Sequence, residues 1–533
     1  MEDNLIGAVI GETSTSELSF IVDITKTRER PLQMGEYVSI EFSKRQAIGI
    51  ITNLRRSNKE IIESLVNSPT AVNRMLKLAM IPGSEVLIAT VAVQGFVEGN
   101  EGKPRIIKPR FPTLPGARVF RDPTELLSIA FGNSDLEIGV LRGNQDVPVQ
   151  LNVTNLVSRH FSVLAVTGAG KSYTMGVILD EIMSKLPYAS VVVIDPHEDY
   201  FYFRDIPKYS NRVTVFTPTG ERNTTRLRFR IRNFTNRQLM NIIGLPSNAS
   251  KQRDLFSRVV DDFNNDRSRL WDFTDLRDTL TAMIADETFK EKEQARGIIR
   301  RLRYFAASEF LDRELEIPVA STTEPALTAP GRLTVINTGL LEQSGKNAMV
   351  NHILRKIFDA AVQWRQNVNE PVEGDTPALL GPVLIIIEEA HQFAPPGERT
   401  DCKMIIQQIA GEGRKFGVGL GIVSQRPGKL DDNVLSQCNT QINLRIVNPR
   451  DQNAIENASE TMSKDLMRDL PGLNTGEAII TGSAIRIPAM VKVRPLDATP
   501  SGTDIDITSY WNSGGMDEIE YGEEDDDLEA MLD

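Results

Sequence analysis

Phe161-Ser-Val-Leu-Ala-Val-Thr-Gly-Ala-Gly-Lys-Ser172 is the stretch that decides the fold. Its apolar first half is typical of a buried strand. A helix is predicted after it, because Met175, Ile178 and Ile182 recur at helical spacing. Glycines between a strand and a helix let backbone N–H groups turn inward, and the helix N-terminus adds positive potential. The stretch therefore predicts a phosphate-binding loop in an α/β domain.

The residue types in this loop predict which side chains contact ATP and Mg²⁺. Lys171 would reach the β- and γ-phosphates, and Ser172 would offer its hydroxyl to Mg²⁺. The other residues that we expect to line the nucleotide are Thr167, Gly168, Ala169, Gly170 and Tyr173. An ordinary glycine-rich turn would not explain the Lys-Ser pair. The pattern has a glycine where this chain has Ala165, which predicts a slightly looser loop.

A second decisive stretch is Val383-Leu-Ile-Ile-Ile-Glu388-Glu389. A carboxylate at the C-terminal end of a parallel strand faces the nucleotide crevice. Glu388 would hold Mg²⁺, and Glu389 would orient the attacking water, which predicts hydrolysis rather than nucleotide binding alone. The alternative is a solvated turn after a core strand.

Four further residues are candidates for the same site. Arg414, in Gly411-Glu-Gly-Arg-Lys-Phe-Gly417, would act as an arginine finger on a neighbouring subunit's nucleotide; otherwise it complements a helix dipole. Gln425 ends an apolar strand and would sense the γ-phosphate or the lytic water, or else cap a turn. Asp195 would organise the crevice or begin a turn. Arg159 would touch a neighbour's nucleotide or lie at the surface.

Composition limits the classes of protein to which this chain can belong. The 533 residues carry a net charge of −12, and ten of the acidic residues lie between Asp517 and Asp533, so the rest of the chain is near neutral. A near-neutral protein can still carry a basic channel, so net charge does not exclude nucleic acid. Two cysteines, no signal peptide and no long apolar run predict a cytoplasmic protein without a membrane segment.

The patterning divides the chain into five regions. Short strands separated by turn residues predict a small β-barrel over residues 1–115, with a helical patch from Lys59 to Met80. Buried-strand patterns over residues 116–230 and 326–497 predict the two parts of a nucleotide-binding α/β core. Residues 231–325 predict a helical insertion, and residues 498–533 an acidic, disordered tail.

Basic side chains are candidates for contact with DNA: Arg296, Arg300, Arg301 and Arg303, and also Arg445 and Arg450. Helical spacing puts Arg296, Arg300 and Arg303 on one face. A solvated helix face is the simpler interpretation. No base-reading motif is present in the sequence. Any contact with nucleic acid is therefore expected to involve the backbone and to be independent of base sequence.

In combination the motifs resemble the HerA family of hexameric DNA-translocating ATPases, in the HerA/FtsK superfamily. The matching stretches are His160–Ser172, Val193–His197, Ile387–His391, Glu412–Gly417, Val423–Pro427, Leu435–Gln441 and Asn448–Asp451. The resemblance implies a HAS-barrel, a RecA-like core with a helical insertion, and a homo-hexamer with double-stranded DNA in its pore. It also implies a partner nuclease, NurA-like in archaea, for DNA end processing. It further implies that Arg486 contacts a neighbour's nucleotide, for which a surface arginine is the simpler interpretation.

Two other functions remain open. Some bacterial relatives of this family serve anti-phage complexes, so a ring that scaffolds and regulates an effector enzyme is the alternative to a helicase. A secretion or conjugation motor is disfavoured, because such motors are commonly anchored in a membrane and no apolar anchor is present in the sequence.

Overall fold

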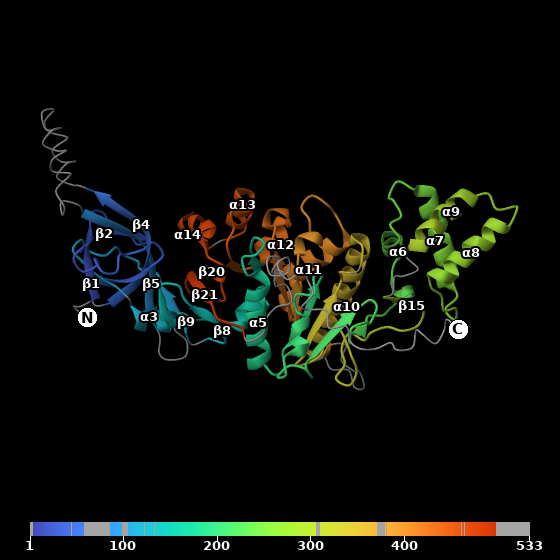
Figure 1. The fold of residues 1–533 in the computed structure, drawn as a ribbon, viewed down its shortest axis with the longest axis horizontal. Helices are drawn as coiled ribbons and strands as arrows, with labels where there is room; N and C mark the ends of the chain where they lie inside the picture. Colours follow the sequence, from blue (N-terminus) through green and yellow to red (C-terminus); the bar gives the residue numbers. More distant parts are fainter. Residues whose placement is uncertain are drawn as a thin grey trace, which may run out of the picture.

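The computed structural model describes residues 4–43, 45–57, 86–98, 105–121, 123–132, 134–304, 310–339, 341–369, 379, 381–459, 461–462 and 464–496. The predicted helical patch from Lys59 to Met80 and the predicted disordered tail after residue 498 lie outside these ranges. The described chain forms a row: a β-barrel at one end, an α/β core in the middle and a helical unit at the other end (Figure 1). No helix in the described ranges is both long enough and apolar enough to cross a bilayer.

Six strands close the N-terminal barrel. They are β1 (Leu5–Ile10), β2 (Glu17–Val22), β3 (Tyr37–Phe42), β4 (Arg45–Ser57), β5 (Val86–Glu98) and β7 (Arg118–Arg121). Their order is β2-β1-β7-β3-β4-β5, and a further pairing of β2 with β5 closes the ring. The short strand β6 (Arg105–Ile107) pairs antiparallel with the end of β5. Strand β7 lies beyond the boundary expected at residue 115, and it fills the place between β1 and β3.

The core is built on a 12-stranded sheet in the described part of the chain, ordered β13-β12-β16-β11-β17-β18-β10-β19-β20-β21-β8-β9. Its strands are β8 (Leu136–Leu141), β9 (Asn144–Leu151), β10 (Phe161–Leu164), β11 (Ser190–Asp195), β12 (Val213–Thr217), β13 (Thr225–Arg226), β16 (Leu333–Asn337), β17 (Val383–Ile387), β18 (Val418–Ser424), β19 (Thr440–Asn443), β20 (Glu477–Thr481) and β21 (Ala489–Val493). Strands β13 through β19 in this order run parallel, and the last four are antiparallel. The carboxyl ends of β10, β11, β17 and β18 therefore meet at one edge.

Helices cover both faces of this sheet, as the continuous apolar strands require. Helix α5 (Lys171–Lys185) shares a buried cluster with Val193 and Ile386, while α10 (Gln343–Asn369) and α11 (Asp401–Phe416) share another with Ile194 and Ile387. Shorter helices are α3 (Thr124–Phe131), α4 (Val153–Ser158), α12 (Asp432–Gln437), α13 (Pro449–Ala458) and α14 (Lys464–Asp469). The chain is thus an α/β protein with a RecA-like P-loop core behind a small barrel.

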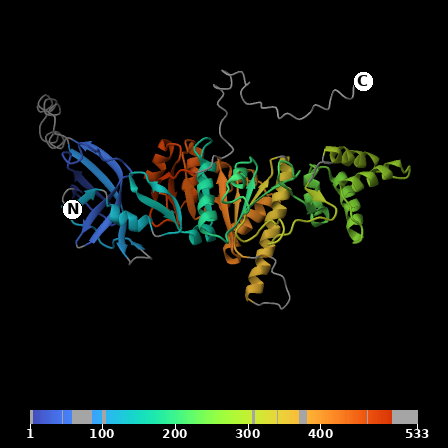
Figure 2. The ribbon, with the colours of Figure 1, turned by 60° about the horizontal axis from the view of Figure 1, so that its bottom comes forward.

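The helical insertion leaves the core between β13 and β16. It contains α6 (Asn236–Ile242), α7 (Ser250–Asn265), α8 (Phe273–Ala285) and α9 (Lys292–Tyr304), and β14 (Phe229–Arg230) pairs with β15 (Leu311–Asp312) at its base. The apolar face of α7 is buried. Helix α10 runs between the sheet and this unit (Figure 2).

The barrel and the core share a continuous apolar contact. Phe131 of α3 meets Tyr37 of β3 edge to face, with ring centroids 5.6 Å apart. The buried Tyr37 hydroxyl donates to the carbonyl of Pro488, at 2.5 Å, and burial raises the pKa of this phenol. This joint fixes the barrel against the antiparallel end of the large sheet.

Candidate active site

The phosphate loop joins β10 to α5 at the carboxyl edge of the sheet. Gly168 and Gly170 have φ values of 77° and 95°, a region that side chains with a Cβ rarely adopt. Gly170 is the N-cap of α5, and the N–H of Ala169 donates to the carbonyl of Val166 at 3.2 Å. The two glycines are therefore required by the turn that directs backbone N–H groups inward.

Ala165 sits on the strand side of this loop. Its N–H donates to the carbonyl of Ser424 at 3.3 Å, and its methyl group is fully buried on the α5 face of the sheet. The turn itself is set by the two glycines with positive φ. The methyl group thus fits into the core at a position where the P-loop pattern has glycine.

Lys171, Glu388 and Glu389 meet in one buried cluster. The Lys171 Nζ forms an ion pair with Glu388 and lies 3.3 Å from Glu389 Oε1. The three side chains are only 5%, 1% and 5% exposed. Burial opposes the lysine charge, but attraction by the two carboxylates raises the pKa of Lys171 above its ordinary value. The lysine expected to bind phosphate and the two acids that follow β17 thus converge.

The backbone at Glu389 is strained. Its φ is 49°, which is uncommon for a residue that is not glycine. The preceding residue, Glu388, still donates its N–H to the carbonyl of Ile194 in the neighbouring strand β11, at 3.1 Å. The chain therefore turns sharply at Glu389 and brings its carboxylate back toward Lys171, and such strain is concentrated at functional sites.

Asp195 organises the turn after β11. Its carboxylate accepts the backbone N–H groups of His197, Asp199 and Tyr200, at 3.1, 3.2 and 3.0 Å. Burial, together with the nearby charges of Asp199 and Glu388, raises the pKa of Asp195 to about 7 although these N–H groups oppose the shift. Asp195 thus acts on the site through the turn that it holds.

Two residues of that turn reach the site directly, and the sequence analysis did not single them out. The buried hydroxyl of Tyr200 donates to Glu388 Oε1, and Asp199 Oδ2 accepts the hydroxyl of Ser172 at 2.7 Å. The only sequence signal was their place just after a buried strand that ends in Asp195. Asp199 lies 27 residues from Ser172 along the chain, and Tyr200 lies 188 residues from Glu388. These contacts could therefore not be inferred from spacing in the sequence.

Gln425 lies at the phosphate loop. Strand β18 runs between β17 and β10, so the amide that follows it faces the loop, and Thr167 donates to Gln425 Oε1 at 2.6 Å. Beside it, His391 Nδ1 lies 3.1 Å from Ser424 Oγ and 3.2 Å from Glu389 Oε2. Ser424 Oγ also accepts the N–H of Arg426, at 3.0 Å. A polar chain therefore connects Glu389 to the loop after β18.

The oxygen donors around Lys171 fit Mg²⁺. Ser172 supplies a hydroxyl, and Glu388 and Asp199 supply carboxylates. Mg²⁺ prefers oxygen ligands and usually keeps several waters and phosphate oxygens, so one or two protein ligands suffice. Within the described residues no group of three or more His, Cys, Asp or Glu side chains is arranged to hold a metal, which leaves this mixed set as the candidate.

Three predicted arginines lie at the opposite edge of the sheet. Arg159, the C-cap of α4, lies two residues before β10, Arg414 is in the last turn of α11 just before β18, and both are exposed. Strand β18 spans about 20 Å between that edge and the nucleotide edge. Arg486, in the turn between β20 and β21, donates to the carbonyls of Ala130 and Gly132 at the end of α3, at 3.0 and 2.8 Å. The structure does not bring these arginines to the phosphate loop of their own chain.

Tyr173 follows Ser172 in α5 and is half-buried. Its hydroxyl accepts the N–H of Leu496 at 2.6 Å, which ties the helix to the segment after β21. A nucleotide contact by Tyr173 stays a prediction.

The structure gives physical reasons for the motif around residue 448. Asn448 caps α13 by accepting the N–H of Arg450 at 2.9 Å, with Pro449 in the first helical turn. Asp451 Oδ1 accepts the N–H of Gly428 at 2.8 Å. These bonds tie the loop after β19 to the loop after β18.

Comparison with known proteins identifies the family. Residues 6–99 match the HAS barrel domain, residues 136–357 match the central domain of the helicase HerA, and residues 373–503 match the helicase HerA-like C-terminal domain. The chain belongs to the HerA helicase family. It is 37% identical to the DNA double-strand break repair helicase HerA of Pyrococcus furiosus, over 80% of this chain and 83% of that protein.

A second relative covers almost the whole chain. The DNA double-strand break repair helicase HerA of Saccharolobus solfataricus is 31% identical over 95% of each chain. Among solved structures, VirB4 of Thermoanaerobacter pseudethanolicus covers 68% of this HerA-family chain and 97% of its own, with 15% identity and a TM-score of 0.45. The family assignment rests on the sequence relatives.

Proposed function

We propose that this protein hydrolyses ATP with Mg²⁺ and couples hydrolysis to movement along double-stranded DNA. The observation that carries the proposal is the meeting of Lys171, Glu388 and Glu389 at the end of the phosphate loop. A lysine for the β- and γ-phosphates and two carboxylates at the carboxyl end of a parallel strand of the same sheet are the parts that hydrolytic P-loop enzymes use.

The residues divide the work as follows. The loop N–H groups and Lys171 bind the phosphates, and Lys171 exchanges its two carboxylate partners for phosphate oxygens. Ser172 and Glu388 hold Mg²⁺, which neutralises charge on the β- and γ-oxygens. Glu389 orients the attacking water, and Gln425 contacts the γ-phosphate or that water.

A ring of identical subunits completes the site. Arg414 and Arg159 lie about 20 Å from the phosphate loop of their own chain, so they can neutralise transition-state charge only on another subunit's nucleotide. This geometry supports the homo-hexamer that the sequence resemblance implies. Native mass spectrometry with and without ATP would measure the number of subunits.

The relatives named above are called DNA double-strand break repair helicases, which supports a role in DNA repair; the partner nuclease in DNA end processing is what the sequence resemblance implies. Affinity purification from the native host, followed by identification of the co-purifying protein, tests the partner. A nuclease is expected, and a different effector enzyme would support the regulatory alternative.

The central test measures ATPase activity with and without duplex DNA, together with displacement of a protein roadblock from a DNA end. We expect stimulation by DNA and ATP-dependent displacement. An active ATPase that shows neither would contradict the translocase and favour a ring that regulates an effector.

A further inference from the structure

Four cations border the nucleotide site on the two loops that follow β18 and β19. They are Arg426 and Lys429 on the first loop and Arg445 and Arg450 on the second, and all four are exposed. In the described part of the chain, none of these four side chains has a hydrogen bond or ion pair. We call these four residues the cationic rim.

The two loops flank the first residues of the phosphate loop. Thr167 donates to Gln425 on one side, at 2.6 Å, and the N–H of Val166 donates to the carbonyl of Arg445 on the other, at 3.0 Å. The loops are also joined to each other. Gly428 lies so close to α13 that a Cβ there would be 3.1 Å from Arg450 Cγ. The two loops that carry the cationic rim are therefore packed against each other beside the phosphate loop.

A chain of polar contacts connects the first of these loops to Glu389, the proposed catalytic carboxylate. Glu389 contacts His391, His391 contacts Ser424, and Ser424 accepts the N–H of Arg426, with each distance between 3.0 and 3.2 Å. A shift of Glu389 on nucleotide binding or hydrolysis can therefore move the loop that carries Arg426 and Lys429. Cations without partners on a protein whose net charge is −12 fit a polyanionic ligand.

We propose that the cationic rim binds the sugar-phosphate backbone of duplex DNA, so that changes at the nucleotide are transmitted directly to the DNA-contacting loops. This inference rests on the proposed function and adds to it the residues that contact DNA. Exposed lysines and arginines without base-reading partners contact phosphates without regard to base sequence.

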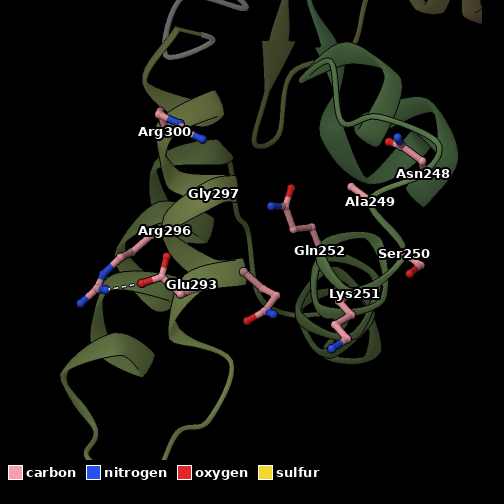
Figure 3. A pocket seen from close by; sticks show the side chains of 10 residues that line it. Asn248, Ala249, Ser250, Lys251, Gln252, Glu293, Arg296, Gly297 and Arg300 are labelled. Carbon is pink, nitrogen blue, oxygen red and sulfur yellow. Dashed lines mark hydrogen bonds and ion pairs between the residues drawn. The ribbon is translucent and has the colours of Figure 1, made fainter.

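The other arginine cluster provides a matched control. Arg296 and Arg300 of α9 line an open cavity of about 690 Å³ beside the start of α7 (Figure 3). There Arg296 is already paired with Glu293, at 2.7 Å. These two arginines belong to the insertion rather than to the loops around the nucleotide, and removing them also removes surface charge.

The experiment compares full-length wild-type protein with two variants, K429A/R445A/R450A and R296A/R300A. The readouts are affinity for a fluorescent DNA duplex as a function of salt, basal ATPase rate and DNA-stimulated ATPase rate. We expect the triple variant to bind duplexes of any sequence at least about tenfold more weakly. The slope of the logarithm of affinity against the logarithm of salt concentration should fall by the equivalent of about three phosphate contacts. Its basal ATPase rate should stay unchanged while DNA stimulation is lost, and R296A/R300A should behave as wild type.

A charge-preserving variant, K429R/R445K/R450K, separates charge from folding and should retain DNA binding. The inference is overturned if the triple variant binds DNA as wild type does, if R296A/R300A loses binding instead, or if the charge-preserving variant is equally defective. Stronger dependence of RNA binding than of DNA binding on these cations would also overturn it. If wild-type protein neither binds duplex DNA nor responds to it, the proposed function itself fails.

Discussion

Lys171 is held by the groups that must release it when nucleotide binds. Its ion pairs with Glu388 and Glu389 keep a buried ammonium compensated in the nucleotide-free chain. Replacing Lys171 by alanine leaves two buried carboxylates facing each other without their cation. We therefore expect Lys171→Ala to abolish nucleotide binding and turnover, as measured by fluorescent ATP-analogue titration and phosphate release.

Glu389→Gln separates binding from chemistry at the same cluster. The amide keeps the size of the side chain but cannot accept the proton of the attacking water. Turnover should fall by at least about a hundredfold while the analogue still binds. Substantial residual turnover would show that another carboxylate, such as Asp199, orients the water.

Tyr200 holds Glu388, the acid that we propose binds Mg²⁺. Its hydroxyl fixes one oxygen of Glu388 while Lys171 holds the other. In Tyr200→Phe this acid loses one restraint, so the Mg²⁺ concentration for half-maximal ATPase should rise about three- to tenfold, the effect of one hydrogen bond. The matched control is Tyr209→Phe, because the Tyr209 hydroxyl bonds to Asp180 away from the site, at 2.8 Å. Equal Mg²⁺ dependence in the two variants would refute the role of Tyr200.

Among contacts between secondary-structure elements, those of Glu316 hold the end of the insertion against the core. Its carboxylate forms an ion pair with Lys356 of α10 and accepts the N–H of Arg230 at 2.6 Å and the amide of Asn233 at 2.8 Å. Burial alone would raise the pKa of Glu316. The nearby His352 ring, whose Nε2 lies 3.6 Å from Glu316 Oε1, and the hydrogen bonds from Lys356 and the Arg230 N–H outweigh burial and lower this pKa to about 2.

Because the pKa of Glu316 is lower in the folded chain than its ordinary value, its ionised form stabilises the fold above about pH 4.5. That contribution is lost as the pH falls toward 2. Glu316→Gln should therefore lower the free energy of unfolding by about 1–3 kcal/mol at pH 7, and the difference from wild type should shrink between pH 4.5 and 2. Thermal unfolding across this range measures the effect, with the exposed neighbour substitution Glu314→Gln as control. A difference that is constant with pH would contradict the assignment.

Sequence patterns reveal elements better than they reveal contacts between elements. The strand, loop and helix from Phe161 onward and the buried run ending at Glu388 were predictable, because each is a local pattern of apolar residues, glycines and charges. The hydrogen bonds of Tyr200 and Thr167 join residues 188 and 258 positions apart. They depend on strand order, which no local pattern encodes. The pairing of β7 with β1 and β3, which completes the barrel, could not be predicted for the same reason.

In the whole molecule, the sheet separates the phosphate loop from the arginines that we propose complete the site. The phosphate loop follows β10 at one edge, and Arg159 and Arg414 lie at the other, so the proposed complete site needs two chains facing each other in a fixed direction. Such head-to-tail contacts close into a ring when the rotation between subunits permits it. Each chain then gives its arginines to one neighbour and receives arginines from the other.

This arrangement predicts complementation between two inactive proteins. An Arg414→Ala chain keeps its phosphate loop but lacks the finger, whereas a Lys171→Ala chain lacks the loop function but keeps Arg414. In rings assembled from an equal mixture, up to about a quarter of the interfaces would pair an intact loop with an intact finger. DNA-stimulated ATPase activity should therefore reappear on mixing, although each protein alone has little. Mixing each variant with itself after the same disassembly and reassembly is the control. If the mixture stays inactive while mixed rings are seen by native mass spectrometry, Arg414 does not act on the neighbour's nucleotide and serves only the end of its own helix.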